Sequence, residues 1–276
     1  MIKINIKILL AIIFLFFASC KEKVKSLKDN RTSIDTTSIV KVDTKALPNK
    51  IQIEGECNQD EWIKRYINDL DVILIEYNEN KIATENFGNL LLENQNFYLG
   101  YIGVNKKRLD IFFNTIEINK SNILKYPLKG YTIVNKNKRF FRGFIEIGDV
   151  YRFEHFSDGA DDIMKGKIKD QGIFVANYYL EEDSNLSATG VFKGRCVIKW
   201  YVDKKNVLRY DDIEDYSDSY SNNQFIGTWT SYKTNKSQIC AWGQLRIPCA
   251  GDLDIGAAEF SPNEKYFKFG WKGYKP

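Results

Sequence analysis

The residues that could do chemistry in this chain include a single histidine, His155, which stands between Glu154 and Phe156. Histidine titrates near neutral pH and can act as a general base. A Ser-His-Asp triad would have to recruit this one residue, and the sequence has no Gly-x-Ser-x-Gly turn to present a nucleophile. A lone histidine is more often structural, so we assign no catalytic residue.

Paired carboxylates are a second source of chemistry. Glycoside hydrolysis uses one acid to donate a proton and another to attack or to activate water. The adjacent acids Glu181 and Glu182, and likewise Asp211 and Asp212, would point to opposite faces of a strand. Neither couple is therefore expected to form a catalytic pair.

Three acids near the C-terminus, Asp252, Asp254 and Glu259, lie beside glycines and could supply oxygen ligands to calcium. Asp252 and Asp254 could also share a face as a carboxylate pair. Their spacing departs from that of an EF-hand loop. We favour a solvated turn or a salt bridge to Arg246, and we assign neither a metal nor a cofactor.

The chain has five cysteines, of which Cys20 belongs to the N-terminal segment described below. The other four have no Cys-x-x-Cys spacing, and with a single histidine they do not suggest a zinc site. An even number of cysteines in an exported protein predicts disulfides, with three possible connectivities. We favour Cys240 with Cys249, because the segment between them could close a hairpin, which leaves Cys57 with Cys196.

Residues 210–220 form an acidic stretch that carries three tyrosines, Tyr210, Tyr216 and Tyr220. Aromatic residues make up 14% of the chain, and in an all-β protein most of them fill the core and cross-strand pairs. This stretch is polar enough to be exposed. We therefore predict it as a contact loop that presents its three rings to a partner.

The N-terminus has the layout of a secretory signal, with Lys3 and Lys7, an apolar run over residues 8–17, and then Ala18-Ser19-Cys20. The run is shorter than the about 20 residues that a spanning helix needs. Residues 17–20 resemble the lipobox of bacterial lipoproteins. That resemblance implies cleavage before Cys20 and a diacylglycerol and N-acyl chain, such as palmitate, on this cysteine.

The flank of this motif bears on which membrane is involved. In that family an aspartate after the acylated cysteine is the familiar inner-membrane retention signal, and here Lys21 follows instead. Residues 21–23 also lack the acidic run of some surface-exported lipoproteins. The resemblance implies the periplasmic face of the outer membrane.

Charge is nearly balanced, with 40 basic and 36 acidic residues and a net charge of +4. No block of like charge stands out past residue 30, so nucleic acid is disfavoured as a partner, and export disfavours it further. The expected partners are the membrane, through the lipid anchor, and an envelope protein, a glycan or a small hydrophobic ligand.

Two segments precede the main body of the domain. Residues 21–50 are polar without a sustained period, which predicts a flexible tether. Asn58 is a good N-cap, and Trp62, Ile63, Tyr66 and Ile67 recur at helical spacing, so we predict one short helix whose apolar stripe packs on a sheet.

From residue 71 onward the apolar residues alternate, and short polar breaks separate runs rich in β-branched and aromatic residues. This pattern is typical of an antiparallel meander. Strand glycines preceded by an aromatic residue, as in Phe192-Lys193-Gly194 and Phe225-Ile226-Gly227, mark bends or close approaches that would let the meander coil into a barrel. The clearest runs are residues 72–75, 109–113, 131–134, 140–145, 172–179, 191–201 and 225–230.

The order of these glycines and aromatics over residues 95–235, with Gly227-Thr228-Trp229 near the end, resembles calycin-like β-barrel or meander domains of Gram-negative lipoproteins. The resemblance implies an all-β fold and no particular activity.

Together these observations predict a signal peptide over residues 1–19, a lipidated cysteine and tether over 20–50, and a barrel with a short helix over 51–236. Residues 237–276 are predicted as an irregular cap of the same domain. We expect a non-enzymatic binding or interaction module of the cell envelope. The alternative is a carboxylate-dependent hydrolase acting on envelope glycans.

Overall fold

The computed structural model describes residues 57–70, 74–76, 87–92, 97–153, 155 and 164–274. The chain divides into two compact units, Met1–Lys50 and Ile51–Pro276, and all described elements belong to the second. The predicted signal peptide, Cys20 and the tether lie outside the described residues. In chain order the elements are α1 (Gln59–Asn68), β1 (Leu74–Glu76), η1 (Phe87–Leu91), β2 (Phe97–Ile102), β3 (Lys107–Ile116), β4 (Lys125–Val134), β5 (Asn137–Phe153), β6 (Ile168–Glu182), β7 (Gly190–Asp203), β8 (Leu208–Tyr210), β9 (Asn222–Ser231), β10 (Ser237–Gln244), η2 (Gly251–Leu253) and η3 (Glu264–Phe269).

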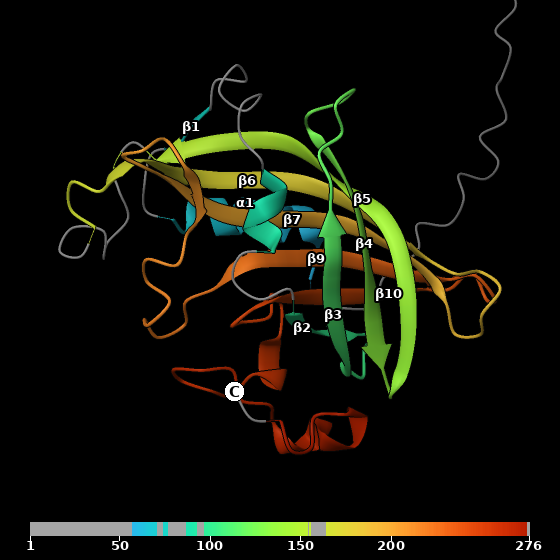
Figure 1. Cartoon of the computed structure of the whole chain (residues 1–276). Helices are drawn as coiled ribbons and strands as arrows, with labels where there is room; N and C mark the ends of the chain where they lie inside the picture. The colour runs from blue at the N-terminus through green and yellow to red at the C-terminus, as the bar shows by residue number, and fades with distance from the viewer. Residues whose placement is uncertain are drawn as a thin grey trace, which may run out of the picture. The chain divides into compact units, whose positions relative to one another are not determined.

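An 8-stranded antiparallel barrel is the centre of this unit (Figure 1). The strands follow the order β5-β4-β3-β2-β10-β9-β7-β6, and β6 pairs with β5 to close the ring. β1 extends the edge of β5, and β8 pairs with β7. The predicted all-β meander is confirmed. The last strand in sequence, β10, pairs with β2 and β9, so the barrel continues past residue 236 and the irregular region begins only after Gln244.

Side chains fill the barrel interior. Trp242 stacks on Phe225 with ring centroids 5.1 Å apart, and the ring of Tyr178 meets that of Trp242 edge-on at 4.9 Å. A barrel of eight strands is just wide enough for its own side chains to fill. A ligand at its centre would have to displace this aromatic core, whose largest buried members on the strands are Tyr98, Phe113, Phe174, Tyr178, Phe192, Trp200, Phe225 and Trp242.

Two strand glycines make room for one of these rings. Gly194 of β7 and Gly227 of β9 are register partners. A Cβ atom at Gly194 would lie 2.7 Å from the hydroxyl oxygen of Tyr178, and one at Gly227 would lie 2.5 Å from it. The predicted role of such glycines, close approach inside a strand, is therefore found at this pair.

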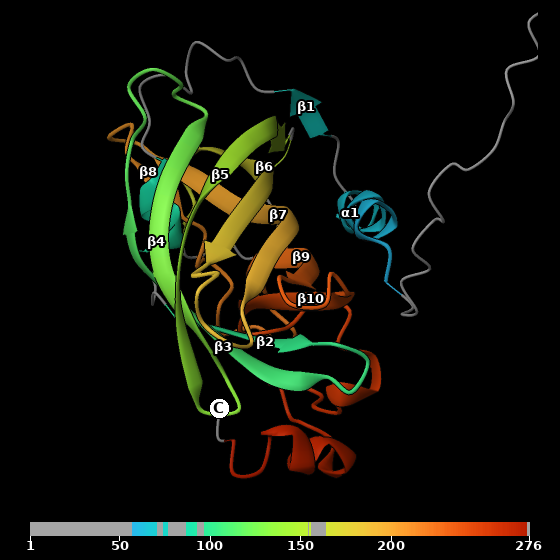
Figure 2. The ribbon, with the colours of Figure 1, turned by 90° about the vertical axis from the view of Figure 1, so that its right-hand side faces the viewer.

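The predicted helix is present as α1, on the outside of the barrel (Figure 2). The side chain of Asn58 accepts hydrogen bonds from the backbone N–H groups of Asp60 and Glu61, at 2.9 and 3.2 Å. Ile63 packs against Val175 of β6 and Val197 of β7. The helix is thus capped and oriented as its sequence pattern predicts.

Residues 245–274 form the irregular C-terminal region, which covers the outer face of β2 and β10. Trp271 is fully buried there, and its indole N–H donates to the carbonyl of Lys106 across 2.7 Å. It packs in a cluster with outward-facing strand residues such as Leu99 and Ala241. The predicted cap is therefore a packed layer without regular secondary structure beyond two short 3-10 helices.

The favoured cysteine pairing is wrong. Cys57 forms a disulfide with Cys249, with Cα atoms 6.0 Å apart, while Cys196 and Cys240 are free and fully buried. Cys196 and Cys240 point into the barrel core, whereas Cys57 and Cys249 pack with the residues on its outer face. The barrel wall separates the members of each predicted pair, and the observed disulfide ties the start of α1 to the C-terminal region.

Candidate binding site at the barrel rim

Three hairpin connections meet at one end of the barrel. They comprise the turn between β4 and β5 together with the first four residues of β5 (135–140), the connection between β6 and β7 (183–189) and the connection between β9 and β10 (232–236). These three segments are called the rim. The guanidinium of Arg139 donates two hydrogen bonds to the carbonyl of Ser187, at 3.0 and 2.9 Å. The backbone N–H of Tyr232 donates to the carbonyl of Thr189 at 3.1 Å. Figure 1 shows the second and third connections together at the right-hand edge of the barrel.

A groove of about 660 Å³ opens at this rim. Its outer side carries a cross-strand row on β4, β5 and β6 made by Lys129, Arg142 and Glu181. The guanidinium of Arg142 donates to Glu181 across 2.8 Å, and its side chain is 79% exposed. The groove is lined by Asn114, Thr115, Lys129, Gly130, Phe140, Phe141, Arg142, Glu181, Glu182, Asp183, Ser184, Asn185 and Tyr232.

A buried carboxylate forms the floor of this groove. Glu182 is 6% exposed and accepts hydrogen bonds from Thr132 at 2.7 Å, from the Gly190 N–H at 2.9 Å and from the Trp229 indole at 3.1 Å. Burial raises the pKa of Glu182 above its usual value, and these hydrogen bonds oppose that shift. All three donors belong to the barrel wall, so they hold Glu182 in place as the floor of the groove.

The groove continues along the outer wall as a second hollow of about 360 Å³. Both hollows share the row of Lys129, Arg142 and Glu181. Beyond that row, Phe144 of β5 stacks on its register partner Tyr179 of β6 at 5.7 Å. The two hollows thus form one continuous surface with aromatic rings on either side of a charged row.

Two polar side chains of this surface are available to a ligand. Among the residues described, the side chains of Lys129 and Asn114 make no hydrogen bond or ion pair. Phe140 is 62% and Tyr232 37% exposed. Aromatic edges combined with unpaired polar groups are typical of a surface that binds a partner reversibly.

The predicted contact loop, residues 210–220, exposes only one of its three tyrosines. Tyr216 is 66% exposed, but Tyr210 and Tyr220 are buried, at 4% and 8%. The Tyr220 hydroxyl donates to the carbonyl of Asp211, whose carboxylate is itself buried and accepts from Gln171 at 2.8 Å. The prediction of three exposed rings is wrong, because this stretch folds inward over the opposite end of the barrel and leaves Tyr216 alone outside.

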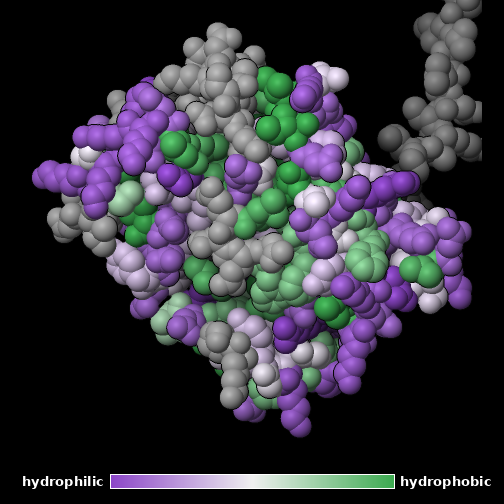
Figure 3. All heavy atoms as spheres, in the orientation of Figure 1, coloured by the Kyte–Doolittle hydropathy of each residue, from purple (hydrophilic) through white to green (hydrophobic). Residues whose placement is uncertain are grey.

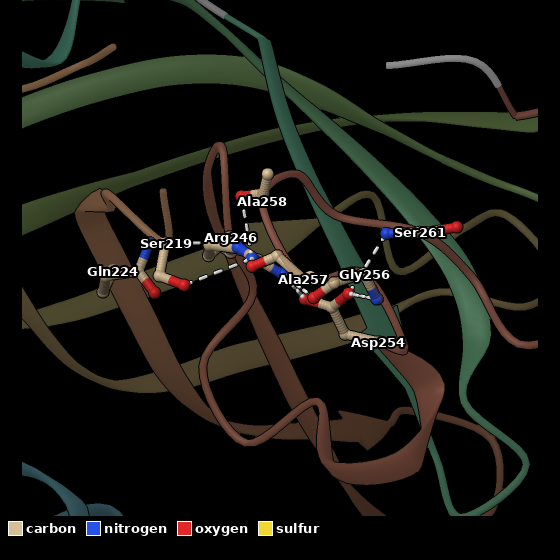
Figure 4. Close-up of polar contacts among 8 residues, drawn as sticks. All are labelled: Ser219, Gln224, Arg246, Asp254, Gly256, Ala257, Ala258 and Ser261. Atoms are coloured by element: carbon tan, nitrogen blue, oxygen red, sulfur yellow. Dashed lines mark hydrogen bonds and ion pairs between the residues drawn. The ribbon is translucent and has the colours of Figure 1, made fainter. Parts of the chain in front are cut away.

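A groove of about 910 Å³ lies between this stretch and the C-terminal region, and Arg246 lines it. The guanidinium of Arg246 donates to Asp254 at 2.5 Å and to the carbonyls of Ala257 and Ala258 at 3.0 and 2.8 Å (Figure 4). A further bond reaches Ser219 at 3.3 Å. This arginine is committed to holding the C-terminal region in place.

The three calcium candidates do not come together as a metal site. Asp254 forms the salt bridge to Arg246 that the sequence offered as an alternative. Asp252 binds Lys106 at 3.3 Å and Lys265, and it accepts a hydrogen bond from Tyr266. Glu259 lines the groove beside Arg246. Within the described ranges, no cluster of three or more metal-ligating side chains occurs.

The remaining catalytic candidates are also dispersed. His155 is exposed just beyond the end of β5. Glu181 pairs with Arg142 on the outer wall while Glu182 points inward, which confirms that these adjacent acids do not form a pair. No arrangement of nucleophile, base and orienting acid is assembled among the described residues that carry these candidates.

Sequence reasoning missed the rim, although a signal for it was present. Between Lys106 and Arg142 the chain has ten basic and two acidic residues, against a net charge of +4 for the whole chain. We expected no block of like charge past residue 30, because the basic residues of this segment are spread along three successive strands, β3, β4 and β5, and the turns between them. Pairing of the strands then gathers them on one wall.

Comparison of the chain with protein-family models, with curated proteins and with solved structures found no match. None of the helices in the described part of the chain is long and apolar enough to cross a membrane.

Proposed function

We propose that this protein is a lipid-anchored, non-enzymatic binding module of the cell envelope, and that its partner binds at the barrel rim. The observation that carries this proposal is the contrast between the barrel interior and the rim. The interior is filled by the protein's own aromatic side chains, whereas the rim opens a groove of about 660 Å³ lined by charged, amide and aromatic groups.

The anchor is supported by the first twenty-three residues of the sequence. Lys3 and Lys7, the short apolar run and the Ala18-Ser19-Cys20 motif together favour export and acylation of Cys20. Acyl chains contribute about 0.8 kcal/mol per buried CH₂, so several chains would hold the barrel durably at a membrane surface. The periplasmic face of the outer membrane is the location that Lys21 favours.

A hydrolase is less well supported by the same groove. Cleavage of a glycosidic bond needs two carboxyl groups on either side of the scissile bond. Glu182 is buried and accepts hydrogen bonds from three donors of the barrel wall, and Glu181 is held by Arg142. Neither is presented as a free acid or base, so we favour binding.

Labelling and cross-linking test the two parts of this proposal. Palmitate should label the wild type and not Cys20→Ala; equal labelling of both would remove the anchor. A photoreactive amino acid placed at Phe140, on the rim, should give adducts in intact cells. The same group at Val207, which is 39% exposed on the turn between β7 and β8, should not. Absence of adducts at both positions, or equal adducts at both, would reject the rim as the contact site.

A further inference from the structure

The rim is strongly basic. Its three connections carry Lys136, Lys138, Arg139, Lys233 and Lys236 and a single acid, Asp183. Within the part of the chain that the structure describes, none of these five cations forms a salt bridge. Among the described residues, none of the five is therefore held in an ion pair, although the charge of Arg139 acts on the nearby carboxylate of Glu182 and opposes the rise in its pKa that burial causes.

Large apolar side chains project among these cations. Phe140, near the start of β5, is 62% exposed, and Leu186 and Tyr232, on the other two connections, are 48% and 37% exposed. The ammonium of Lys138 lies 3.5 Å from the ring centroid of Tyr131 and 5.0 Å from that of Phe140. At the right-hand edge of Figure 3, where the second and third connections lie, hydrophobic side chains stand among hydrophilic ones.

We infer that the rim docks on the surface of a bilayer that contains anionic phospholipids. The inference rests on the proposed function and names the partner of the same site. Basic residues are attracted to anionic headgroups, and aromatic side chains favour the interfacial zone between headgroups and acyl chains. The three hairpin ends present both kinds of group together, and the groove between them offers Lys129 to a phosphate, beside the ion pair of Arg142 with Glu181.

Charge complementarity favours a lipid surface over a folded protein partner. The cations are spread over three separate turns rather than set around one pocket, which suits a broad anionic plane. Phe140 and Leu186 could enter such a plane without a matching cavity, whereas a protein would need one to bury them.

Vesicle binding by residues 51–276 tests this inference. This part of the chain is one compact unit that holds the whole barrel, the C-terminal region and the disulfide, so it contains a complete core. It should co-sediment with vesicles of phosphatidylcholine mixed with phosphatidylglycerol and not with phosphatidylcholine alone. Binding should weaken as salt is added, because the attraction is screened.

Matched variants locate the contact. K136E/K138E should weaken binding by about tenfold or more, since each reversal replaces attraction to the headgroups by repulsion. K204E/K205E makes the same change of charge on the exposed turn between β7 and β8, at the opposite end of the barrel, and should bind like the wild type. F140A should weaken binding at unchanged net charge. Circular dichroism and thermal melts must show that all variants are folded.

Equal binding to both kinds of vesicle, no binding, or equal losses in the two charge-reversed variants would overturn the inference. These outcomes can be told apart from failure of the proposed function. If vesicles are not bound but the photoreactive group at Phe140 captures a protein or a glycan, only the lipid partner is wrong. If neither experiment detects contact at the rim, the proposed function falls as well.

Discussion

Trp229 on β9 donates its indole N–H to Glu182 on β6 across 3.1 Å, although β7 lies between these two strands in the barrel. Thr132 on β4 and the first residue of β7, Gly190, bind the same carboxylate. One buried acid therefore joins four strands directly beneath the rim groove. Such a link holds the floor of the groove in one position, which pre-organises the residues above it for binding.

Glu182 should make stability depend on pH in a defined direction. Burial raises the pKa of Glu182 above its usual 4.5, so the contribution of this group is fully present below that value and decreases as pH rises through the folded-state pKa. E182Q lacks this titration. We expect the free energy of unfolding of the wild type, relative to that of E182Q, to decrease as pH rises from 4.5. Urea unfolding at a series of pH values measures this; parallel profiles would contradict it.

The disulfide between Cys57 and Cys249 joins residues separated by 192 positions, and it ties the start of α1 to the C-terminal region. Removing a native disulfide of this kind costs about 2–5 kcal/mol. We expect C57S/C249S to lose stability in that range in urea unfolding. Reduced wild type is the control and should match the variant; an unchanged midpoint in both would show that the bond contributes nothing.

The two free cysteines should be chemically silent in the folded protein. Cys196 and Cys240 are fully buried in the barrel core, and burial raises the pKa of both thiols. Iodoacetamide should therefore label neither residue in the native state and both after unfolding in urea. Peptide mapping without reduction should recover Cys57 linked to Cys249. Rapid labelling of either thiol in native protein would contradict the placement of these residues.

Tyr216 and Tyr220 offer a matched pair for testing the loop that the sequence predicted as a contact surface. Y220F removes a hydrogen bond to the carbonyl of Asp211 and should destabilise the protein by about 1 kcal/mol. Y216F alters an exposed ring and should change stability by less than about 0.5 kcal/mol. Equal effects of the two substitutions in thermal melts would mean that Tyr220 is not buried as described.

Local patterns were sufficient to predict the helix and the meander. Asn58 and the apolar spacing that follows it specify α1 within a few residues, and alternation along β7 shows which side chains face the core. The cysteine pairing failed because it depends on which face of the wall each residue occupies. For Cys240 that face is set by pairing with β9 and β2, and a register shift between Trp242 and Gln244 follows it.

The site was harder to predict than the fold because its parts are far apart in sequence. Phe140, Leu186 and Tyr232 belong to three different hairpins, and only closure of the barrel brings them to one rim. Tyr220 was misplaced for a related reason. Its burial depends on Asp211 and Lys199, which accommodate a polar segment that composition alone marks as exposed.

Arg246 should be the most sensitive position in the C-terminal region. Its side chain and that of Asp254 are only 14% and 12% exposed, and the Asp254 carboxylate also accepts from the backbone of Gly256 and Ser261 at 3.0 and 3.1 Å. R246M leaves this buried carboxylate without its cation, which typically costs about 3–5 kcal/mol. We expect D254N in the same chain to recover part of that loss, since the variant amide carries no charge.

A double-mutant cycle over R246M and D254N measures this coupling in urea unfolding. Coupling of about 0.5–3 kcal/mol is expected for two groups in direct contact. R142M is the control, because Arg142 forms an ion pair with Glu181 that is largely open to solvent and should contribute far less. Additive effects of R246M and D254N would show that the two side chains act independently. The C-terminal region would then be held mainly by its apolar contacts, with Trp271 at their centre.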